Sequence, residues 1–319
     1  MTNTKIEWTG PGGATWNPVT GCYHDCLYCY ARGQARRFAG RWFENACNFN
    51  SYTGAHMNDR NMVLIPDDDA QHLYDPDCSE DGGVYMVQNR PRFILDAPLK
   101  YRTKAGKFVS APYPFGFCPT FYRYRLDVPQ HWRKPRNIFV GDMCDLFGAW
   151  VPPEWIEDVF EACQAAPQHN YLFLTKNPKR YAQLAKAGKL PAEDNFWFGV
   201  SATNWLSYGK AVDVLLEIEA PFNSFLSYEP AIEPLYVPDA ILGKPSALIT
   251  QSIATFKWVV TGALTGPGAK RQQTKGAWIE DVCRAAEWRR VPVFMKDSLI
   301  PIMGKDGMRR EWPPGLVKW

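Results

Sequence analysis

Short apolar segments alternate with helical patterns along most of the chain, and this alternation most limits the folds available to it. Strands are predicted at residues 15–20, 137–142, 171–176, 196–201, 224–229, 257–262 and 291–296. Helices are predicted over 30–43, after Pro153, and over 178–187, 206–219 and 277–290. Largely apolar strands that alternate with helices are typical of a parallel sheet covered by helices.

The number of these units predicts the architecture. A complete eight-unit β/α barrel usually takes about 250 residues, whereas the pattern here supplies six units and a seventh strand in 319 residues. We therefore expect an α/β fold, a partial (β/α)6 TIM-like barrel in one domain of residues 1–319. The pentapeptide Trp-Ile-Glu-Asp-Val at 155–159 recurs at 278–282, which fits repeated β/α units.

A long insertion, approximately residues 44–135, separates the first predicted helix from the second predicted strand. It is rich in Pro, Gly, Asp and Asn and carries Cys47, Cys78 and Cys118. Inserts of this length in β/α scaffolds are usually lids or binding appendages. Because these three cysteines are widely separated, we expect thiols there rather than a second metal site.

Composition favours a cytoplasmic protein. The first residues lack the apolar run of a signal peptide, and no stretch approaches the length of a membrane span. The nine cysteines are an odd number and include a closely spaced trio, which fits a reducing compartment better than a disulfide scaffold. The net charge of +3 is too small to indicate a nucleic-acid partner by itself.

Three cysteines, Cys22, Cys26 and Cys29, have the spacing Cys-x3-Cys-x2-Cys. Thiolates this close in sequence can bind one metal centre. A structural zinc site takes four ligands, usually as two separated pairs, and the chain has no second pair; His24 is the nearest spare ligand. A [4Fe–4S] cluster is normally held by four cysteines, so three would leave one iron open to another ligand. Zinc, or three thiols without metal, remains the alternative.

With Tyr28 just before the last cysteine, the motif resembles the signature of the radical SAM superfamily. The resemblance implies that the three cysteines ligate a [4Fe–4S] cluster whose open iron binds S-adenosylmethionine (SAM). It also implies reductive cleavage of SAM to methionine and a 5′-deoxyadenosyl radical. An electron donor such as a flavodoxin or ferredoxin is implied by the same chemistry.

Polar residues stand at the predicted strand ends, where parallel β/α folds place their active sites. They are Gly141, Asp142, Cys144, Lys176, Ser201, Glu229, Gly262 and Lys296. Lys176, Glu229 and Lys296 are candidate catalytic residues, although an ion pair without catalytic role explains each equally well. Cys144 is a candidate hydrogen-atom donor, as in the spore photoproduct lyase branch of the superfamily, or else a small residue that fills space.

The superfamily resemblance also implies SAM contacts. The backbone at Tyr28 would lie near the adenine, and Ser201 matches a position that commonly bonds the ribose. The loop after the second strand usually meets the methionine amino group through a Gly-Gly-Glu-like segment, which here reads Gly141-Asp142-Met143. The loop that begins at Gly262 lets the backbone approach a flat ligand or a phosphate.

Sequence blocks along the chain resemble one phage-associated family of radical-SAM-like proteins of unassigned function. The blocks are residues 5–9, 16–22, 139–147, 174–176, 198–201, 227–230 and 261–268. The likeness covers nearly the whole chain outside the insertion at 44–135. It implies the fold and the cofactors but no substrate.

Basic and aromatic residues interleave at 121–125 and 131–136. Together with Arg32, Arg36 and Arg37 they suggest a nucleotide or nucleic-acid substrate, because such patches pair with phosphates and stack bases. A solvated basic turn is the equal alternative. Two other functions remain open: a non-catalytic zinc or Fe–S binding module, and a SAM-dependent methyltransferase-like enzyme.

Overall fold

The computed structural model divides the chain into two compact units. It describes residues 4–38, 62–64, 92–102, 107–219, 222–236, 247–266, 269 and 272–316. The sheet unit comprises Met1–Thr15, Lys134–Phe139 and Pro167–Trp319, and the cysteine unit comprises Trp16–Arg133 and Val140–Ala166. Within the described ranges, no helix combines the length and the apolar character that a membrane span requires.

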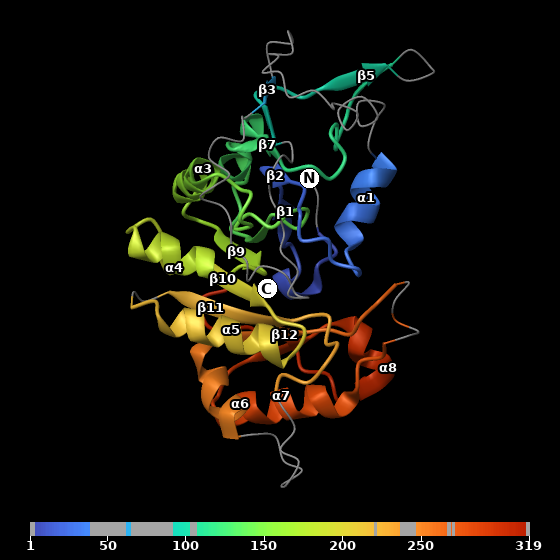
Figure 1. Ribbon diagram of the computed structural model, residues 1–319, viewed down its shortest axis with the longest axis vertical. Coiled ribbons are helices and arrows are strands. Elements are labelled where there is room, and N and C mark those ends of the chain that lie inside the picture. The colour runs from blue at the N-terminus through green and yellow to red at the C-terminus, as the bar shows by residue number, and fades with distance from the viewer. Residues whose placement is uncertain are drawn as a thin grey trace. The chain divides into compact units, whose positions relative to one another are not determined.

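A seven-stranded parallel sheet curls into a half-barrel (Figure 1). Its strand order is β1-β8-β9-β10-β11-β12-β13. The strands are β1 (Ala14–Trp16), β8 (Asn137–Val140), β9 (Asn170–Thr175), β10 (Phe196–Ser201), β11 (Asn223–Tyr228), β12 (Trp258–Thr261) and β13 (Val293–Met295). Seven segments predicted as strands thus contribute to one parallel sheet, and β10 has the predicted bounds.

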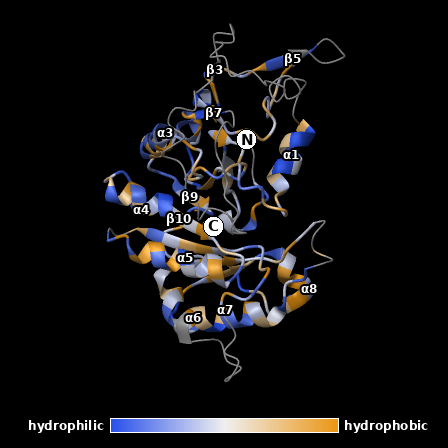
Figure 2. Ribbon diagram, in the orientation of Figure 1, coloured by the Kyte–Doolittle hydropathy of each residue, from blue (hydrophilic) through white to orange (hydrophobic). Residues whose placement is uncertain are grey.

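Helices follow the strands in the predicted alternation. They are α1 (Tyr30–Phe38), α3 (Pro153–Gln164), α4 (Lys179–Lys186), α5 (Trp205–Leu216), α6 (Ala247–Ser252), α7 (Gly276–Trp288) and α8 (Ile300–Met303). Helix α5 begins at a capping box, in which Asn204 Oδ1 accepts from Ser207 N at 2.8 Å. Hydrophilic and hydrophobic residues alternate along the helices (Figure 2), and the buried Tyr208, Ala211 and Leu215 of α5 follow helical spacing.

Both copies of the repeated pentapeptide lie in the first turns of helices, α3 and α7. In each copy the Ile and the Val are completely buried, whereas the Trp is buried only in α3. Cys163, at helical spacing from the first copy, is also completely buried, as its position predicts.

The prediction of one strand over residues 15–20 is wrong. Strand β1 ends at Trp16, and the next two paired residues form β2 (Val19–Thr20) in a second sheet. Pro18 separates them because it has no N–H to donate to a strand ladder, whereas its carbonyl accepts a hydrogen bond from Tyr122 N at 2.7 Å. The sequence analysis made no prediction for the segment that contains helix α6.

The described part of the insertion forms strands. The second sheet has the order β2-β7-β4-β3, with β3 (Met62–Leu64), β4 (Phe93–Leu95) and β7 (Thr120–Tyr122), and β5 (Lys100–Arg102) pairs with β6 (Phe108–Ser110). Phe93 and Phe115 stack at 3.8 Å between ring centroids in a small core of their own. Cys118 is half-buried, and Cys47 and Cys78 lie outside the described residues.

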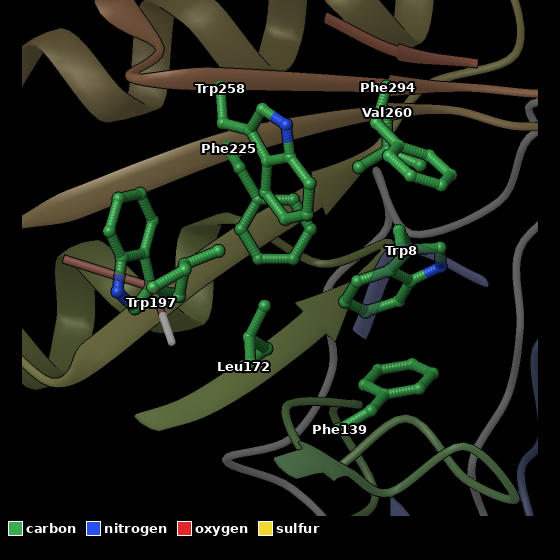
Figure 3. Packing of buried hydrophobic residues seen from close by; sticks show 9 residues of the cluster. Trp8, Phe139, Leu172, Trp197, Phe225, Trp258, Val260 and Phe294 are labelled. Atoms are coloured by element: carbon green, nitrogen blue, oxygen red, sulfur yellow. The ribbon is translucent and has the colours of Figure 1, made fainter. Parts of the chain in front are cut away.

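Aromatic side chains fill one face of the curled sheet (Figure 3). Trp8 lies at the centre of this cluster, with ring centroids 4.7 Å from Phe139, 5.8 Å from Phe225 and 6.0 Å from Trp258. The carbonyl of Trp8 accepts a hydrogen bond from Trp312 Nε1 at 2.8 Å. A segment before β1 and a segment after β13 therefore cover the same apolar face.

Truncation of Trp8 tests the importance of this cluster. The Trp8 side chain is 3% exposed, so Trp8→Ala should lower the free energy of unfolding by about 3–5 kcal/mol through lost burial and a residual cavity. Denaturant unfolding followed by circular dichroism measures this change. Trp288, which is 78% exposed on α7, supplies the control: Trp288→Ala should stay within about 0.5 kcal/mol of the wild type. Equal losses in the two variants would contradict a central role for Trp8.

Candidate functional site

The cysteine loop, residues 21–29, joins β2 to α1 in the cysteine unit. Cys22, Cys26 and Cys29 are half-buried thiols, and Tyr28 is half-buried in the same turn. The amide of Cys29 donates to Cys26 O at 3.1 Å, and the amide of Arg32 points at Cys29 Sγ, 3.4 Å away. Cys29 therefore lies directly before the first residue of α1.

Gly21 allows the loop to begin in a crowded position. Its φ is +89°, and a Cβ built on it would lie 2.2 Å from the carbonyl oxygen of Cys118. The amide of Gly21 donates to Met143 O at 2.9 Å, and Gly21 forms an isolated bridge with Cys144. The chain thus passes between two other backbone segments, and only glycine fits there without displacing them.

The loop after β8, residues 141–147 (the β8 loop), contacts the cysteine loop and its neighbours. Asp142 Oδ1 accepts from Asn17 Nδ2 at 2.5 Å, and the carbonyl of Asp142 accepts from the Tyr30 hydroxyl at 2.9 Å. Asn17 Oδ1 in turn accepts from Met143 N at 3.1 Å. The structure therefore brings the predicted residues Gly141, Asp142 and Cys144 beside the cysteine motif.

Burial raises the pKa of two thiols in this region, Cys22 and Cys144. Burial is the main cause that raises the pKa of Cys22, followed by the charge of Asp145, and the charges of Cys26 and Cys29 raise it further. The pKa of Cys144 is raised by burial and then by Asp145 and Asp142. Loss of such protons needs a cation as partner, because a thiolate buried without one is strongly disfavoured.

The donor set of the cysteine loop fits a cluster bound through three thiolates. One short loop supplies all three thiols, and the hydrogen bond from Cys29 N to Cys26 O closes the turn that carries two of them. In the part of the chain that the structure describes, however, no three His, Cys, Asp or Glu side chains are arranged to hold a metal ion. Binding of one metal centre therefore requires these side chains to turn toward each other.

The remaining predicted residues lie at strand ends of the sheet unit. Ser201 is the last residue of β10, and the other four directly follow their strands: Lys176 after β9, Glu229 after β11, Gly262 after β12 and Lys296 after β13. Because these strands are parallel neighbours, their carboxyl ends share one edge of the sheet.

Two contacts group these strand-end residues. Lys296 Nζ forms an ion pair with Glu229 Oε1, and a Cβ on Gly262 would lie 3.1 Å from Glu229 Cδ. Lys176 Nζ lies 3.5 Å from Ser201 Oγ. The Glu229–Lys296 pair is partly exposed, so a ligand can reach it, but the pair also gives both residues a structural role.

Much of the aromatic and basic pattern at 121–125 is structural. Phe121 and Tyr122 are completely buried in β7, so their rings cannot stack on bases. The Arg125 guanidinium lies 3.7 Å from the Tyr122 ring centroid and donates to Asn17 O at 3.1 Å. Exposed basic side chains of the cysteine unit include Arg36, Arg37 and Arg133.

The sequence analysis missed two contacts in this region. Asn17 donates a hydrogen bond to Asp142, and His24 pairs with Asp145. Asn17 and Asp142 are separated by 125 positions, and neither spacing nor periodicity reports such a contact. The available signal was that Asn17 and Asp145 both lie inside blocks that resemble the phage-associated family. His24 was considered only as a spare zinc ligand.

Substitution of Gly21 should distort the start of the cysteine loop. Gly21→Ala places a Cβ against the backbone carbonyl of Cys118 at positive φ, so we expect the free energy of unfolding to fall by about 1–3 kcal/mol. Gly33→Ala is the matched control, because a Cβ there meets nothing within 4 Å inside α1 and should stabilise the protein by about 0.5–1 kcal/mol. Thermal unfolding of both variants checks the opposite signs, and a tolerated Gly21→Ala would refute the crowding.

The buried carboxyl of Asp142 predicts a pH-dependent stability difference. Its pKa is raised from 3.8 mainly by burial, against the hydrogen bond from Asn17. The folded state therefore holds this proton more tightly than the unfolded chain, and the stability so gained is lost as the pH rises through the raised pKa. Asp142→Asn removes this loss while retaining the acceptor for Asn17. As the pH rises from about 4 to about 7, the free energy of unfolding of the variant should increase relative to that of the wild type. Denaturant titrations at the two pH values measure this difference. A difference that is the same at both pH values would contradict the prediction.

The comparisons with known proteins give one match. A model of the family described as "Protein of unknown function (DUF5131)" matches residues 101–299, more than half of the chain. No curated protein and no solved structure matches the sequence. The matched range includes the β8 loop and the strand-end residues but begins after the cysteine loop. The chain belongs to the DUF5131 family.

Proposed function

We propose that this protein is a radical SAM enzyme built on a partial (β/α)6 barrel of the TIM type. One observation supports this above the others. The Cys-x3-Cys-x2-Cys loop begins after β2, shortly beyond the first strand of the curled parallel sheet, and the loop after the neighbouring strand, β8, contacts it through Gly21 and His24. Adjacent strand-end loops are where parallel β/α folds assemble active sites.

Cys22, Cys26 and Cys29 would hold a [4Fe–4S] cluster as thiolates. When bound, the cluster and SAM would supply a 5′-deoxyadenosyl radical through one-electron cleavage of SAM. Three cysteines fit this role because they leave one iron for a ligand that the protein does not provide. A reduced electron carrier such as a flavodoxin or ferredoxin is the implied partner, and a reducing cytoplasm is the implied compartment.

The residues of the β8 loop suit recognition of a small charged group. The Asp142 carboxylate is half-buried and is oriented by Asn17, so a cationic ligand group would relieve the cost of its burial. The residues that we assign to SAM binding are Tyr28, Gly141, Asp142, Ser201 and Gly262. We assign Cys144, Lys176, Glu229 and Lys296 to the reaction with substrate.

Exposed Arg36, Arg37 and Arg133 support a phosphate-bearing substrate, a nucleotide or a nucleic acid. The competing function is a non-catalytic module in which the cysteines bind zinc or a structural cluster. The ion pair of Glu229 with Lys296 favours that module, because it gives each charged group a partner without a substrate.

Anaerobic reconstitution tests the proposal. The wild-type protein is loaded with iron and sulfide, reduced with dithionite and mixed with SAM, and chromatography measures 5′-deoxyadenosine. We expect about one cluster per chain and product from the wild type. The variant Cys22→Ala/Cys26→Ala/Cys29→Ala should bind no cluster and make no product, because it lacks all three thiolates.

Cys118→Ala is the matched control, since Cys118 flanks Gly21 but lies outside the motif. It should retain the cluster and the product. Tightly bound zinc without a cluster would refute the radical mechanism and favour the binding module. S-adenosylhomocysteine in place of 5′-deoxyadenosine would instead indicate methyl transfer.

A further inference from the structure

A buried hydrogen bond joins the middle of the cysteine motif to the β8 loop. His24 lies between Cys22 and Cys26 in sequence, and its Nε2 is 2.8 Å from Asp145 Oδ2. The two side chains are only 6% and 7% exposed. Because an ionised carboxylate only accepts hydrogen bonds, Nε2 is the donor to an ionised Asp145.

Further contacts hold both ends of this bond in place. Asp145 Oδ1 accepts from Phe147 N at 3.0 Å, which fixes the carboxylate on the β8 loop. The His24 ring meets Trp150 edge-on at 4.8 Å between centroids, and Tyr23 meets the same indole at 5.6 Å. The side chains of Tyr23 and His24 are thus directed toward the β8 loop and the residues after it, while Leu27 at the other end of the motif is completely exposed.

The contacts that hold the cysteine loop differ along its length. Gly21 and the first residues of α1 hold its ends, and the turn from Cys26 to Cys29 is closed by one backbone hydrogen bond. The segment from Cys22 to Cys26 is held by the hydrogen bond from Cys22 N to Phe117 O at 3.2 Å and by the side chains of Tyr23 and His24. Ordering of loop residues before a ligand binds reduces the entropy that binding must overcome.

We propose that His24 is a positioning residue whose hydrogen bond to Asp145 holds the cysteine loop against the β8 loop, so that the backbone carrying Cys22 and Cys26 is ordered before the metal centre binds. The inference rests on the proposed function only for the identity of that centre. His24 acts here through the loop and is not itself a ligand. Outer hydrogen bonds of this kind commonly change metal affinity by about 10–100-fold.

Two variants that differ by one methylene test the bond. His24→Gln carries an amide donor that reaches the position of Nε2, whereas the shorter amide of His24→Asn does not reach Asp145. Hydrogen exchange measured by mass spectrometry on the protein without added iron reports the order of residues 22–29. We expect exchange in this loop to be about tenfold faster in His24→Asn and near the wild-type rate in His24→Gln.

Chelator competition gives the second measurement. After reconstitution with iron and sulfide, His24→Asn should lose iron to a chelator about tenfold faster than the wild type, and His24→Gln should retain it. His131→Asn is the matched control, because His131 is an exposed histidine near Asp127 in the same unit and should change neither readout. Peptides from α4 and α5 report whether each variant remains folded.

If His24→Asn unfolds as a whole, Asp145→Asn takes its place. This variant keeps an acceptor but loses the charge, so it should raise loop exchange by less than tenfold. Unchanged loop exchange in the folded variants would overturn the proposal. Equal defects in His24→Gln and His24→Asn would also overturn it, because they would indicate a ligand role for the imidazole. If the wild type binds no cluster but His24→Asn still shows faster loop exchange than His24→Gln, the proposed function is refuted. The positioning role of His24 is then retained.

Discussion

The inner face of a curled, incomplete sheet must be covered, and the packing of Trp8 on that face is the contact on which the sheet unit depends. A closed barrel fills its interior with side chains from its own strands. Here Trp8 and Trp312, which lie outside the strands, pack on the cluster of Figure 3 and are joined by a hydrogen bond. Burial of large aromatic side chains is among the largest favourable contributions to folding. Segments far apart in the sequence are therefore held together by one apolar surface.

In the cysteine unit, by contrast, partly buried ionisable groups and a crowded glycine cost stability. Near Gly21 the structure buries thiols and the carboxyl of Asp142, and burial raises the pKa of each of these groups. Gly21 itself occupies a backbone position that only glycine adopts without strain. Clusters of ionisable groups with shifted pKa values, held by specific hydrogen bonds, are typical of functional sites. The buried polar contacts here order a loop that carries three thiols, and this is the physical basis of the proposed cluster site.

Two strand-end residues of the sheet unit form an ion pair. Glu229 and Lys296 neutralise each other at the edge of a hydrophobic sheet, and Gly262 leaves room for the Glu229 side chain. A partly exposed ion pair of this kind costs little to maintain and can exchange partners when a charged ligand arrives. In the proposed enzyme, the same residues would pair with each other before the substrate binds and contact the substrate afterwards.

The sequence by itself determined most strands of the large sheet and most of their helices, although not the break at Pro18 or helix α6. Apolar runs such as Phe196–Ser201 form strands because their side chains favour a buried sheet, and the asparagine at 204 starts α5 because its side chain caps the free amides. The cysteine spacing likewise placed three thiols on one loop, and the strand pattern placed Lys176, Glu229 and Lys296 at strand ends. These features depend on residues close together in the chain.

Only the tertiary structure decided which of these features meet. The bond of His24 to Asp145, the contact of Asn17 with Asp142 and the passage of Gly21 beside Cys118 each join segments about a hundred positions apart. The basic and aromatic pattern at 121–125 also changed meaning, because burial of Phe121 and Tyr122 in β7 removes their rings from any ligand. Local propensity reports the backbone conformation of a segment, whereas its partners depend on how sheets and loops pack around a shared core.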